Sequence, residues 1–456
     1  MSLISLLPEL DPNAIVAYYR GRAIKRGVFL GHVLALAETL RSRGNVLNMC
    51  GDRYAFAVAL FAAIAKENIT VLPNSAAPDH LAVVAEEHDN LLVLGDETST
   101  RALNLPFVSI ENYLSDDTMA TAPMPLIAFD QTIVCVYTSG STGNPTAHRK
   151  TFGRVRLNIL AGAERLWQVA RGACSVIGTT PIRHMYGLES SVLLPILGGG
   201  CMSAEIPFFP ADVARSLEQL PSPRLLVTTP FHLRKLVEAD LPLPKISAIL
   251  SATAPLSSEL ARQAEQQFDC VVIEIYGSTE TGQLATRLPC ESDTWETLAG
   301  VELKIDGDEA WAHGEVHETP QLINDIIELV SNEVGEGNGS SRFRLVDRKS
   351  NIINVAGKRS SLSCLNAAIT KLPGVVDAVF FVPKREGGPD IERLAAFIVA
   401  PGLGRAEVFA GLRAQVDPVF LPRPLIFIDA LPRDGNGKIP AAKMQALIAQ
   451  HMSASV

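Results

Sequence analysis

Short apolar segments alternate with amphipathic ones through most of the chain, and this alternation limits the possible folds more than any other feature. The spacing predicts helices near 29–40, 54–67, 211–220, 230–238 and 257–268. Strand-like runs lie at 46–49, 70–72, 174–179, 224–229, 246–251 and 271–275. Because these runs are apolar on both faces, they predict mainly parallel sheets flanked by helices. Gly44 is expected to end the first helix in a left-handed cap.

The pattern changes after residue 300. Short β-like runs at 301–305, 343–347 and 352–355 flank a Gly/Ser/Asn-rich stretch at 335–341, which is expected to be a loop. From residue 361 onward, helical and strand patterns alternate compactly, as in a separate α+β module. We therefore expect an α/β protein with a large N-terminal domain, residues 1–349, and a small C-terminal α+β domain, residues 350–456.

Composition excludes several classes of function. The 40 Lys and Arg residues are outnumbered by 49 Asp and Glu residues, and a formal charge of −9 gives no reason to expect a nucleic acid or an anionic membrane as partner. Seven cysteines without a Cys-x-x-Cys pair favour a reducing cytoplasm over a disulfide framework. The N-terminal segment lacks the pattern of a signal peptide, and the uncharged stretches are too short to span a bilayer.

A hydroxyl-rich glycine loop follows the apolar run at 133–137. It reads Thr138, Ser139, Gly140, Ser141, Thr142, Gly143. Glycine allows close backbone approach, and the amides and hydroxyls can donate to phosphate oxygens, although a solvated Gly/Ser linker has the same composition. The loop lacks the Gly-Lys-Ser/Thr ending of a P-loop, and no Gly-x-Gly-x-x-Gly opens a helix as in a dinucleotide fold. The segment 276–280 also follows a strand-like run, so the two segments could face one crevice.

Four further segments accompany the loop in a fixed order: 181–187, 276–280, 347–359 and 431–439. Taken together, they resemble the adenylate-forming superfamily, which includes acyl- and aryl-CoA synthetases, and the resemblance covers most of the chain. It implies that a carboxylate attacks the α-phosphorus of ATP to give an acyl-adenylate and pyrophosphate. A thiol then takes the acyl group.

The resemblance also implies a role for individual residues. Lys438 would bridge the carboxylate and the α-phosphate, Thr279 would donate to that phosphate, and Glu280 would hold Mg²⁺. His184 would lie beside the substrate carboxylate. The remaining nucleotide-binding residues would be those of the 138–143 loop with Tyr276, Gly277, Asp325 at the ribose and Arg348 near the ribose and phosphates. Outside this context, such residues are more often a solvated turn lysine, a helix cap, a surface ion pair or a core histidine.

Two residues depart from the family pattern. The lysine that commonly follows the proline of the phosphate loop is replaced by Thr146, and Lys150 is expected to neutralise pyrophosphate instead. The hinge residue, usually Asp or Lys, aligns with Ser350. The small domain would rotate about this residue between adenylation and thioester formation.

The substrate is expected to be a small carboxylic acid with an uncharged aryl or short to medium acyl tail. In amino-acid-activating relatives an aspartate pairs with the α-ammonium group, whereas the equivalent position here falls near Tyr186, which supplies no countercharge. The acyl pocket would be lined by Tyr186, Gly187, Ser251, Ala252 and Thr253. The acceptor would be coenzyme A or the phosphopantetheine of an acyl carrier protein. A catalytically idle adenylate-binding regulator and a stand-alone amino-acid adenylation enzyme remain as alternatives.

Overall fold

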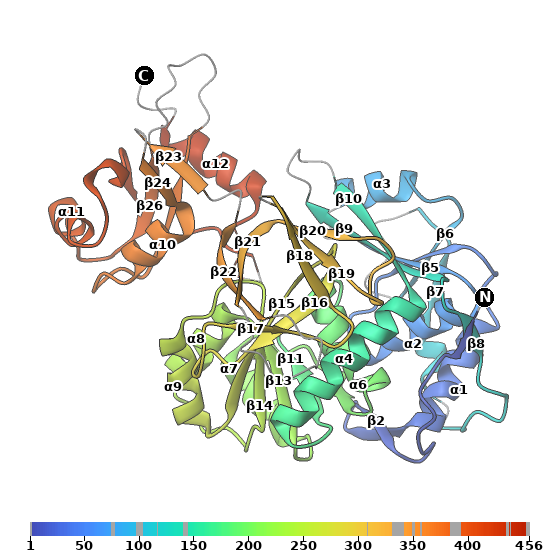
Figure 1. Ribbon diagram of the computed structural model, residues 1–456. Helices are drawn as coiled ribbons and strands as arrows, with labels where there is room; N and C mark the ends of the chain where they lie inside the picture. Colours follow the sequence, from blue (N-terminus) through green and yellow to red (C-terminus); the bar gives the residue numbers. More distant parts are fainter. Residues whose placement is uncertain are drawn as a thin grey trace. The chain divides into compact units, whose positions relative to one another are not determined.

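The computed structural model describes residues 2–73, 78–96, 104–115, 117–139, 145–307, 309–330, 342–348, 352–355, 358–383, 394–434, 437 and 439–452. The chain divides into two compact units. Unit 1 comprises Met1–Ile305, Trp311–Leu322 and Val330–Arg342, and unit 2 comprises Asp306–Ala310, Ile323–Leu329 and Phe343–Val456. Figure 1 shows the elements of both units, coloured along the sequence.

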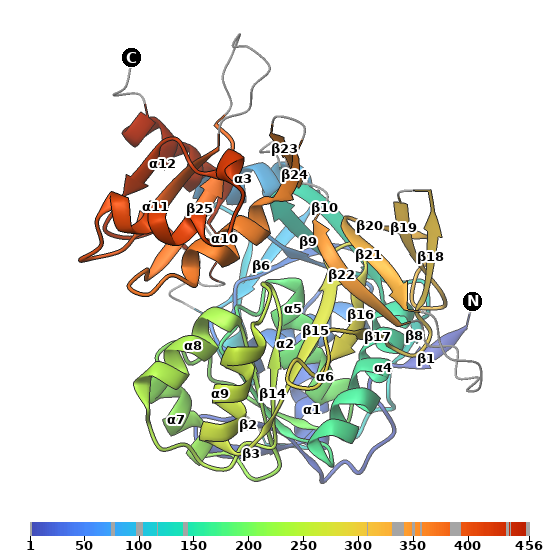
Figure 2. The same cartoon turned by 60° about the vertical axis from the view of Figure 1, so that its left-hand side comes forward.

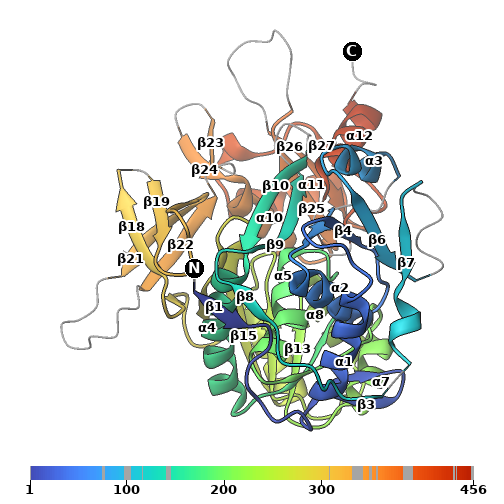
Figure 3. The ribbon, with the colours of Figure 1, turned by 90° about the vertical axis from the view of Figure 1, so that its right-hand side faces the viewer.

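The first sheet of unit 1 has the strand order β10-β9-β5-β4-β6-β7. Its strands are β4 (Asn45–Asn48), β5 (Ile69–Leu72), β6 (Leu91–Gly95), β7 (Phe107–Ser109), β9 (Thr132–Ser139) and β10 (Pro145–Thr151). All neighbours pair in parallel except β10, which runs antiparallel to β9 at the sheet edge. Figure 3 shows this edge and the helices α1 (Arg26–Ala37) and α2 (Arg53–Ala65).

The second sheet of unit 1 runs in the order β17-β16-β15-β14-β13-β11-β12-β2-β3. Its strands are β2 (Ile15–Tyr19), β3 (Arg22–Lys25), β11 (Ser175–Gly178), β12 (Cys201–Ser203), β13 (Arg224–Thr228), β14 (Ala248–Ser251), β15 (Val271–Ser278), β16 (Gly282–Arg287) and β17 (Trp295–Thr297). The strands from β2 to β15 in this order pair in parallel, whereas β3, β16 and β17 add antiparallel edges.

Helices cover both faces of this second sheet, as its doubly apolar strands require. One face packs against α7 (Pro210–Glu218), α8 (Pro230–Ala239) and α9 (Ser258–Phe268) through a core that includes Leu233 and Ile249. Figure 2 shows these three helices together. The other face packs against α4 (Phe152–Ala170) and α6 (Leu194–Leu197), where Leu166 meets Leu225 and Leu250. Between α4 and α6 in sequence lie α5 (Met185–Gly187) and a π-helix, η2 (Leu188–Leu193).

Several smaller elements lie between residues 3 and 323. They are β1 (Leu3–Ser5) paired with β8 (Leu126–Ala128), α3 (Pro78–Glu86), the 3₁₀ helix η1 (Ile110–Tyr113), and a sheet of order β18-β19-β20 made by Glu302–Asp306, Glu309–His313 and Gln321–Ile323.

Unit 2 contains a small α+β core. The three-stranded sheet β25 (Asp377–Phe381), β26 (Ala395–Val399) and β27 (Leu425–Phe427) carries α10 (Leu362–Thr370) and α11 (Arg405–Arg413) on one face and α12 (Ala441–Met452) on the other. Its other strands are β21 (Asp325–Val330), β22 (Arg342–Arg348), β23 (Ile352–Val355) and β24 (Lys358–Ser361). A 3₁₀ turn, η4 (Pro418–Phe420), lies between α11 and β27. These elements agree with the α+β pattern expected from residue 361 onward.

The predicted α/β class is confirmed, and most predicted helices and strands of unit 1 lie within a few residues of their observed bounds. The expected cap at Gly44 is wrong. Helix α1 ends at Ala37, and the left-handed residue is Arg43, with φ 60°. Gly44 instead allows a close approach, because its N–H donates to Asn68 Oδ1 at 2.6 Å and a Cβ there would lie 2.8 Å from that oxygen.

All seven cysteines are free thiols. Cys364 on α10 is exposed, whereas the others are buried or half-buried. Burial raises the pKa of each of those six thiols. Within the part of the chain that the structure describes, no helix combines the length and apolar character needed to cross a membrane.

Candidate active site

The predicted phosphate-binding segments each connect two antiparallel strands. The glycine loop joins β9 to β10, and the segment with Thr279 and Glu280 joins β15 to β16. Both follow strands, as the sequence predicts, but neither leads into a helix, so the helix-cap alternative for Thr279 and Glu280 does not apply. The two hairpins meet through side chains of β10.

His148 on β10 links the two hairpins. Its Nε2 lies 3.0 Å from Thr138 Oγ1 and 3.6 Å from Glu280 Oε1. Burial lowers the pKa of His148, the nearby Lys150 lowers it further, and Glu280 opposes both. A mostly neutral imidazole therefore connects the start of the glycine loop to the Glu280 carboxylate.

Lys150 points to the same turn from the same face of β10. Its Nζ donates to the backbone carbonyl of Glu280 at 2.7 Å. Burial lowers the pKa of the Lys150 amine, and two carboxylates, Glu189 and then Glu280, favour its charged form. The ammonium group is thus directed into the protein beneath the turn.

Glu189 is the buried carboxylate opposite Lys150. It lies on η2 and is only 5% exposed. Burial raises its pKa to about 8, and Lys150 is the main group that lowers it. A Cβ added to Gly282, which has φ 70°, would lie 3.3 Å from Glu189 Oε1 and 3.1 Å from Asn158 Oδ1. The carboxylate therefore lies against the residue that ends the Glu280 turn.

The backbone of this turn is held at successive residues. His317 Nε2 lies 2.9 Å from the Thr281 carbonyl oxygen, and burial lowers the pKa of this imidazole, so a neutral ring can donate there. Ser278 N–H donates to Thr281 Oγ1 at 3.0 Å, and Thr281 N–H donates to Ser278 Oγ at 3.2 Å. A turn with so many fixed groups presents Thr279 and Glu280 in a defined orientation.

The Glu280 carboxylate suits a hard cation. Burial alone would raise its pKa, but hydrogen bonds from its own backbone N–H and from Ser278, together with His148 and Lys150, lower it below the usual value. Its side chain is 37% exposed, so ligands can reach it. Mg²⁺ in nucleotide sites is usually bound through one or two carboxylates and substrate phosphates. Within the described ranges, no cluster of three His, Cys, Asp or Glu side chains could hold a metal alone.

The predicted acyl-pocket residues gather at the ends of strands β13 and β14. Tyr186 reaches the carbonyl oxygens of Thr228 and Leu250 with its hydroxyl, at 3.0 and 2.9 Å. Burial raises the pKa of Tyr186 well above its usual value, so the phenol stays neutral. Ser251 Oγ and Thr253 Oγ1 are buried without a hydrogen-bond partner, and Thr253 has a left-handed φ of 78°.

Three more predicted residues are fixed by close packing. Gly187 is required by the Pro181 carbonyl oxygen, which a Cβ would approach to 2.1 Å. Gly277 is required in the same way by the Gly282 carbonyl oxygen, also at 2.1 Å. Tyr276 packs its ring against Trp295, with centroids 5.6 Å apart. His184 precedes α5 and is half-buried, and Ala252 is buried in the core under α4.

Several predicted residues are not brought together by the described structure. Gly140, Ser141, Thr142, Gly143, Ser350 and Lys438 lie outside the described residues, and Ser139 and Arg348 are described only as backbone of β9 and β22. Asp325 begins β21 and belongs to unit 2. Thr146 is exposed on β10.

Sequence reasoning missed Glu189 and His317. A signal for Glu189 was available, because it is a single carboxylate next to the apolar run 192–197, and a charge in such a place requires a partner. His317 carried no comparable signal. Its role depends on a contact with Thr281, which is 36 positions away in the sequence.

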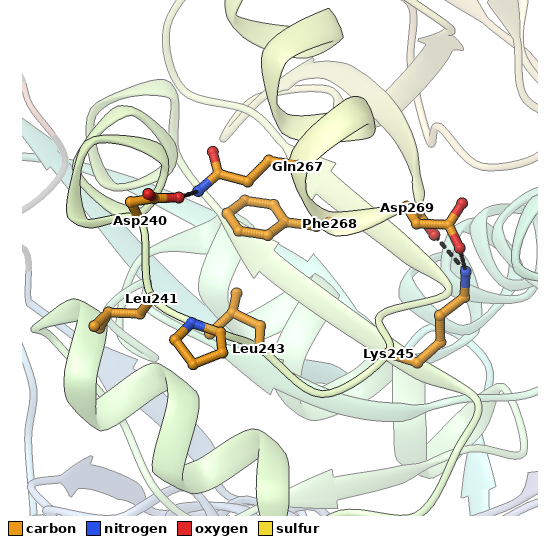
Figure 4. A pocket seen from close by; sticks show the side chains of 8 residues that line it. Asp240, Leu241, Leu243, Lys245, Gln267, Phe268 and Asp269 are labelled. Carbon is orange, nitrogen blue, oxygen red and sulfur yellow. Dashed lines mark hydrogen bonds and ion pairs between the residues drawn. The ribbon is translucent and has the colours of Figure 1, made fainter.

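A separate surface hollow of about 530 Å³ lies where α8 ends and α9 meets β15 (Figure 4). Its lining residues are Asp240, Leu241, Pro242, Leu243, Lys245, Gln267, Phe268 and Asp269. Its polar groups pair with one another, since Gln267 donates to Asp240 at 3.1 Å and Lys245 is bound by Asp269. The hollow contains none of the predicted site residues.

Comparison with known proteins agrees with this geometry. Residues 12–316 match the model of the AMP-binding enzymes, and residues 365–438 match the model of their C-terminal domain. The chain belongs to the AMP-binding enzyme family. The resemblance inferred from the motifs is therefore confirmed.

Relatives in this family are acid–CoA ligases. The 4-coumarate–CoA ligase of Cereibacter sphaeroides is 27% identical over 66% of this chain and 69% of its own length. The indoleacetate–CoA ligase of Aromatoleum aromaticum is 22% identical, with 97% of this chain and 96% of the relative covered. The predicted reaction class, ATP-dependent ligation of an acid to a thiol, is confirmed by these relatives.

The fold is shared with solved synthetases. The o-succinylbenzoate CoA synthetase of Bacillus subtilis, in complex with its acyl-adenylate intermediate, superposes with a TM-score of 0.79 at 17% identity, and the match covers 96% of each chain. ATP-bound MatB from Rhodopseudomonas palustris gives a TM-score of 0.79 at 16% identity, again over 96% of each chain. These matches confirm the predicted fold class.

Proposed function

We propose that this family member activates a carboxylic acid with an uncharged tail as its acyl-adenylate and passes the acyl group to coenzyme A. The observation that carries the proposal is the junction at His148. The Nε2 atom of this imidazole lies near both the Thr138 hydroxyl, which begins the glycine loop, and the Glu280 carboxylate. This contact supports the expectation that the glycine loop would bind phosphate next to Glu280 as a cation ligand, an arrangement suited to attack on a polyphosphate.

Within this proposal, Glu280 would hold Mg²⁺, and Thr279 would donate to the α-phosphate. Magnesium, when bound, would offset charge on the phosphates where two anionic reactants meet. Lys438 would bridge the carboxylate and the α-phosphate, with Asp325 and Arg348 at the ribose. A crystal structure of the Bacillus subtilis synthetase contains ATP and a magnesium ion, which supports the choice of cofactors for a protein of this fold.

The charge pattern supports an acid with an uncharged tail. An amino acid substrate would need a free carboxylate near its ammonium group. Among the residues that the structure describes, the buried carboxylates in this part of unit 1 are Glu189 and Glu274, and a cation lies near each. Glu274 is bound by Arg287 at 2.6 Å, and Glu189 faces Lys150. Tyr186 is neutral and its hydroxyl is bound to strand carbonyls. Coenzyme A is favoured over a carrier protein because the relatives named above are CoA ligases.

Carboxylate-dependent exchange of labelled pyrophosphate into ATP tests the proposal. We expect exchange with aryl or short to medium acyl acids and little with amino acids. Exchange with amino acids alone would support the amino-acid adenylation alternative. ATP binding without exchange across the whole panel would support an idle adenylate-binding protein. Thioester yield with coenzyme A compared with a phosphopantetheinylated carrier protein then identifies the acceptor.

The hinge proposal has its own test. Ser350→Pro restricts backbone rotation at that residue. We expect it to spare pyrophosphate exchange and to slow thioester formation. Equal loss of both half-reactions would contradict a hinge at Ser350.

The free thiols agree with action in a reducing compartment such as the cytoplasm.

A further inference from the structure

The strand β10 directs two of its side chains toward the Glu280 turn. Alternate residues of a strand point to opposite faces. His148 and Lys150 share the inward face, and Arg149 between them is exposed. The cation nearest the turn is therefore Lys150, and its neighbour Arg149 provides a matched cation on the other face.

The surroundings of Lys150 are those of a structural ammonium group. Nζ donates to the Glu280 carbonyl at 2.7 Å, and the buried carboxylate of Glu189 is the strongest charge that favours its protonated form. The Nζ of Lys150 is thus already used as a donor to a backbone carbonyl of the turn. This arrangement favours a role beneath the turn over neutralisation of pyrophosphate.

Glu189 and Lys150 act on neighbouring residues of one turn. Lys150 holds the carbonyl of Glu280, and the Glu189 carboxylate lies against Gly282, where only a residue without a Cβ fits at φ 70°. His317 holds the carbonyl of Thr281 between them. Three polar groups, one buried and two half-buried, thus converge from three distant segments on residues 280–282.

We infer that Lys150, through its hydrogen bond to the Glu280 carbonyl, is a positioning residue that fixes the backbone of the Thr279–Glu280 turn. The inference rests on the proposed function in so far as Glu280 is taken as the magnesium ligand. It replaces the expectation that Lys150 itself binds pyrophosphate. Groups that orient a metal ligand in this way usually change activity by about 10- to 100-fold when they are removed.

Hydrogen exchange of the protein without ligands tests the positioning directly. We expect Lys150→Met to accelerate amide exchange in a peptide that spans residues 276–284 by about tenfold, because the turn loses a fixed carbonyl. Arg149→Met should leave that peptide unchanged. Unchanged amide hydrogen exchange of this peptide in the Lys150→Met protein would overturn the inference. Because no substrate is involved, this result does not depend on the proposed reaction.

Kinetics of pyrophosphate exchange separate the two roles of Lys150. A positioning residue predicts a kcat about 10- to 100-fold lower in Lys150→Met, with KM for ATP changed less than threefold. A phosphate ligand predicts instead a raised KM for ATP and pyrophosphate. That second pattern would refute the inference.

A double variant supplies the rescue. Lys150→Met leaves the buried Glu189 without the cation near it, whereas Lys150→Met with Glu189→Leu removes both polar groups. We expect the double variant to regain at least threefold of the lost kcat. A double variant no better than Lys150→Met would contradict positioning through this pair. If the wild-type protein shows no pyrophosphate exchange with any acid, the proposed function fails. The amide hydrogen exchange of Lys150→Met then still decides whether Lys150 positions the turn.

Discussion

Arg53 and Lys150 are two cations inside unit 1, and the protein accommodates their positive charges in different ways. Arg53, at the start of α2, is fully buried and donates to Ser191 Oγ, to Gly178 O at 2.9 Å and to Ser203 O at 2.8 Å. Its acceptors are neutral. Lys150 shares its environment with a carboxylate, Glu189, that can itself take up a proton. The Arg53 guanidinium therefore joins strand ends through hydrogen bonds to neutral acceptors. The charged form of the Lys150 amine, in contrast, depends on the nearby carboxylate of Glu189.

The largest effect is expected from Arg53→Met. Loss of the guanidinium leaves several buried carbonyl groups without a donor, and each orphaned group costs about 1–3 kcal/mol. We expect unfolding by urea to show a loss of about 5 kcal/mol that is constant between pH 5 and 8. A loss below about 1 kcal/mol would show that water or a rearranged donor replaces Arg53.

Lys150→Met should destabilise the protein in a pH-dependent manner. The folded-state pKa of Glu189 is raised to about 8, above its value in the unfolded chain, so folding takes up a proton. The stability conferred by protonated Glu189 is complete below the unfolded pKa and is lost as pH rises toward the folded value. Without Lys150 the folded pKa rises further.

Between pH 5 and 8 Glu189 is mostly protonated in both folded proteins, so we expect the cost of Lys150→Met to change little with pH. Above pH 8 that cost should grow by up to about 1.36 kcal/mol for each pH unit. Urea melts of wild type and variant between pH 5 and 10 measure it, and a loss that stays flat above pH 8 would remove the distinction between the two cations.

The double variant Lys150→Met, Glu189→Leu should recover most of that loss. Replacement of a buried ion pair by apolar groups is often neutral, whereas removal of one partner is costly. We expect stability within about 1 kcal/mol of wild type at pH 9. The coupling energy from the double-mutant cycle measures the pair, and a value near zero would mean that the two groups act independently.

The smallest effect is expected from Ser191→Ala. The Ser191 hydroxyl accepts from Arg53 Nε at 3.1 Å and donates to the Gly187 carbonyl at 2.6 Å. Its removal takes one acceptor of several from Arg53, so the loss should be about 1 kcal/mol and independent of pH. A loss as large as that of Arg53→Met would make the hydroxyl, rather than the carbonyl groups, the main support of the guanidinium.

Local signals predicted most of unit 1. Helix α8 illustrates this, because Thr229 caps it, Pro230 starts it and its apolar face repeats at helical spacing. The cap expected at Gly44 failed for a tertiary reason, since the glycine is used for approach to Asn68 and the chain turns at Arg43 instead.

The candidate site was predictable in its motifs and not in its supports. Thr138, Thr279 and Glu280 stand in recognisable segments. The contact of Lys150 with the Glu280 carbonyl spans 130 positions, and any acceptor in the fold would satisfy an amine equally well. Such long-range pairing of a side chain with a backbone group leaves no pattern in the sequence, so the contact of Lys150 with Glu280 was not predicted.

The cysteines offer a practical consequence. Thiolates, not thiols, react with maleimides, and six of the seven cysteines combine restricted access with a raised pKa. Cys364 alone is exposed, and it lies on α10 of unit 2. A maleimide dye should therefore label the C-terminal unit selectively in the unmodified protein, which gives the proposed rotation about Ser350 an optical readout.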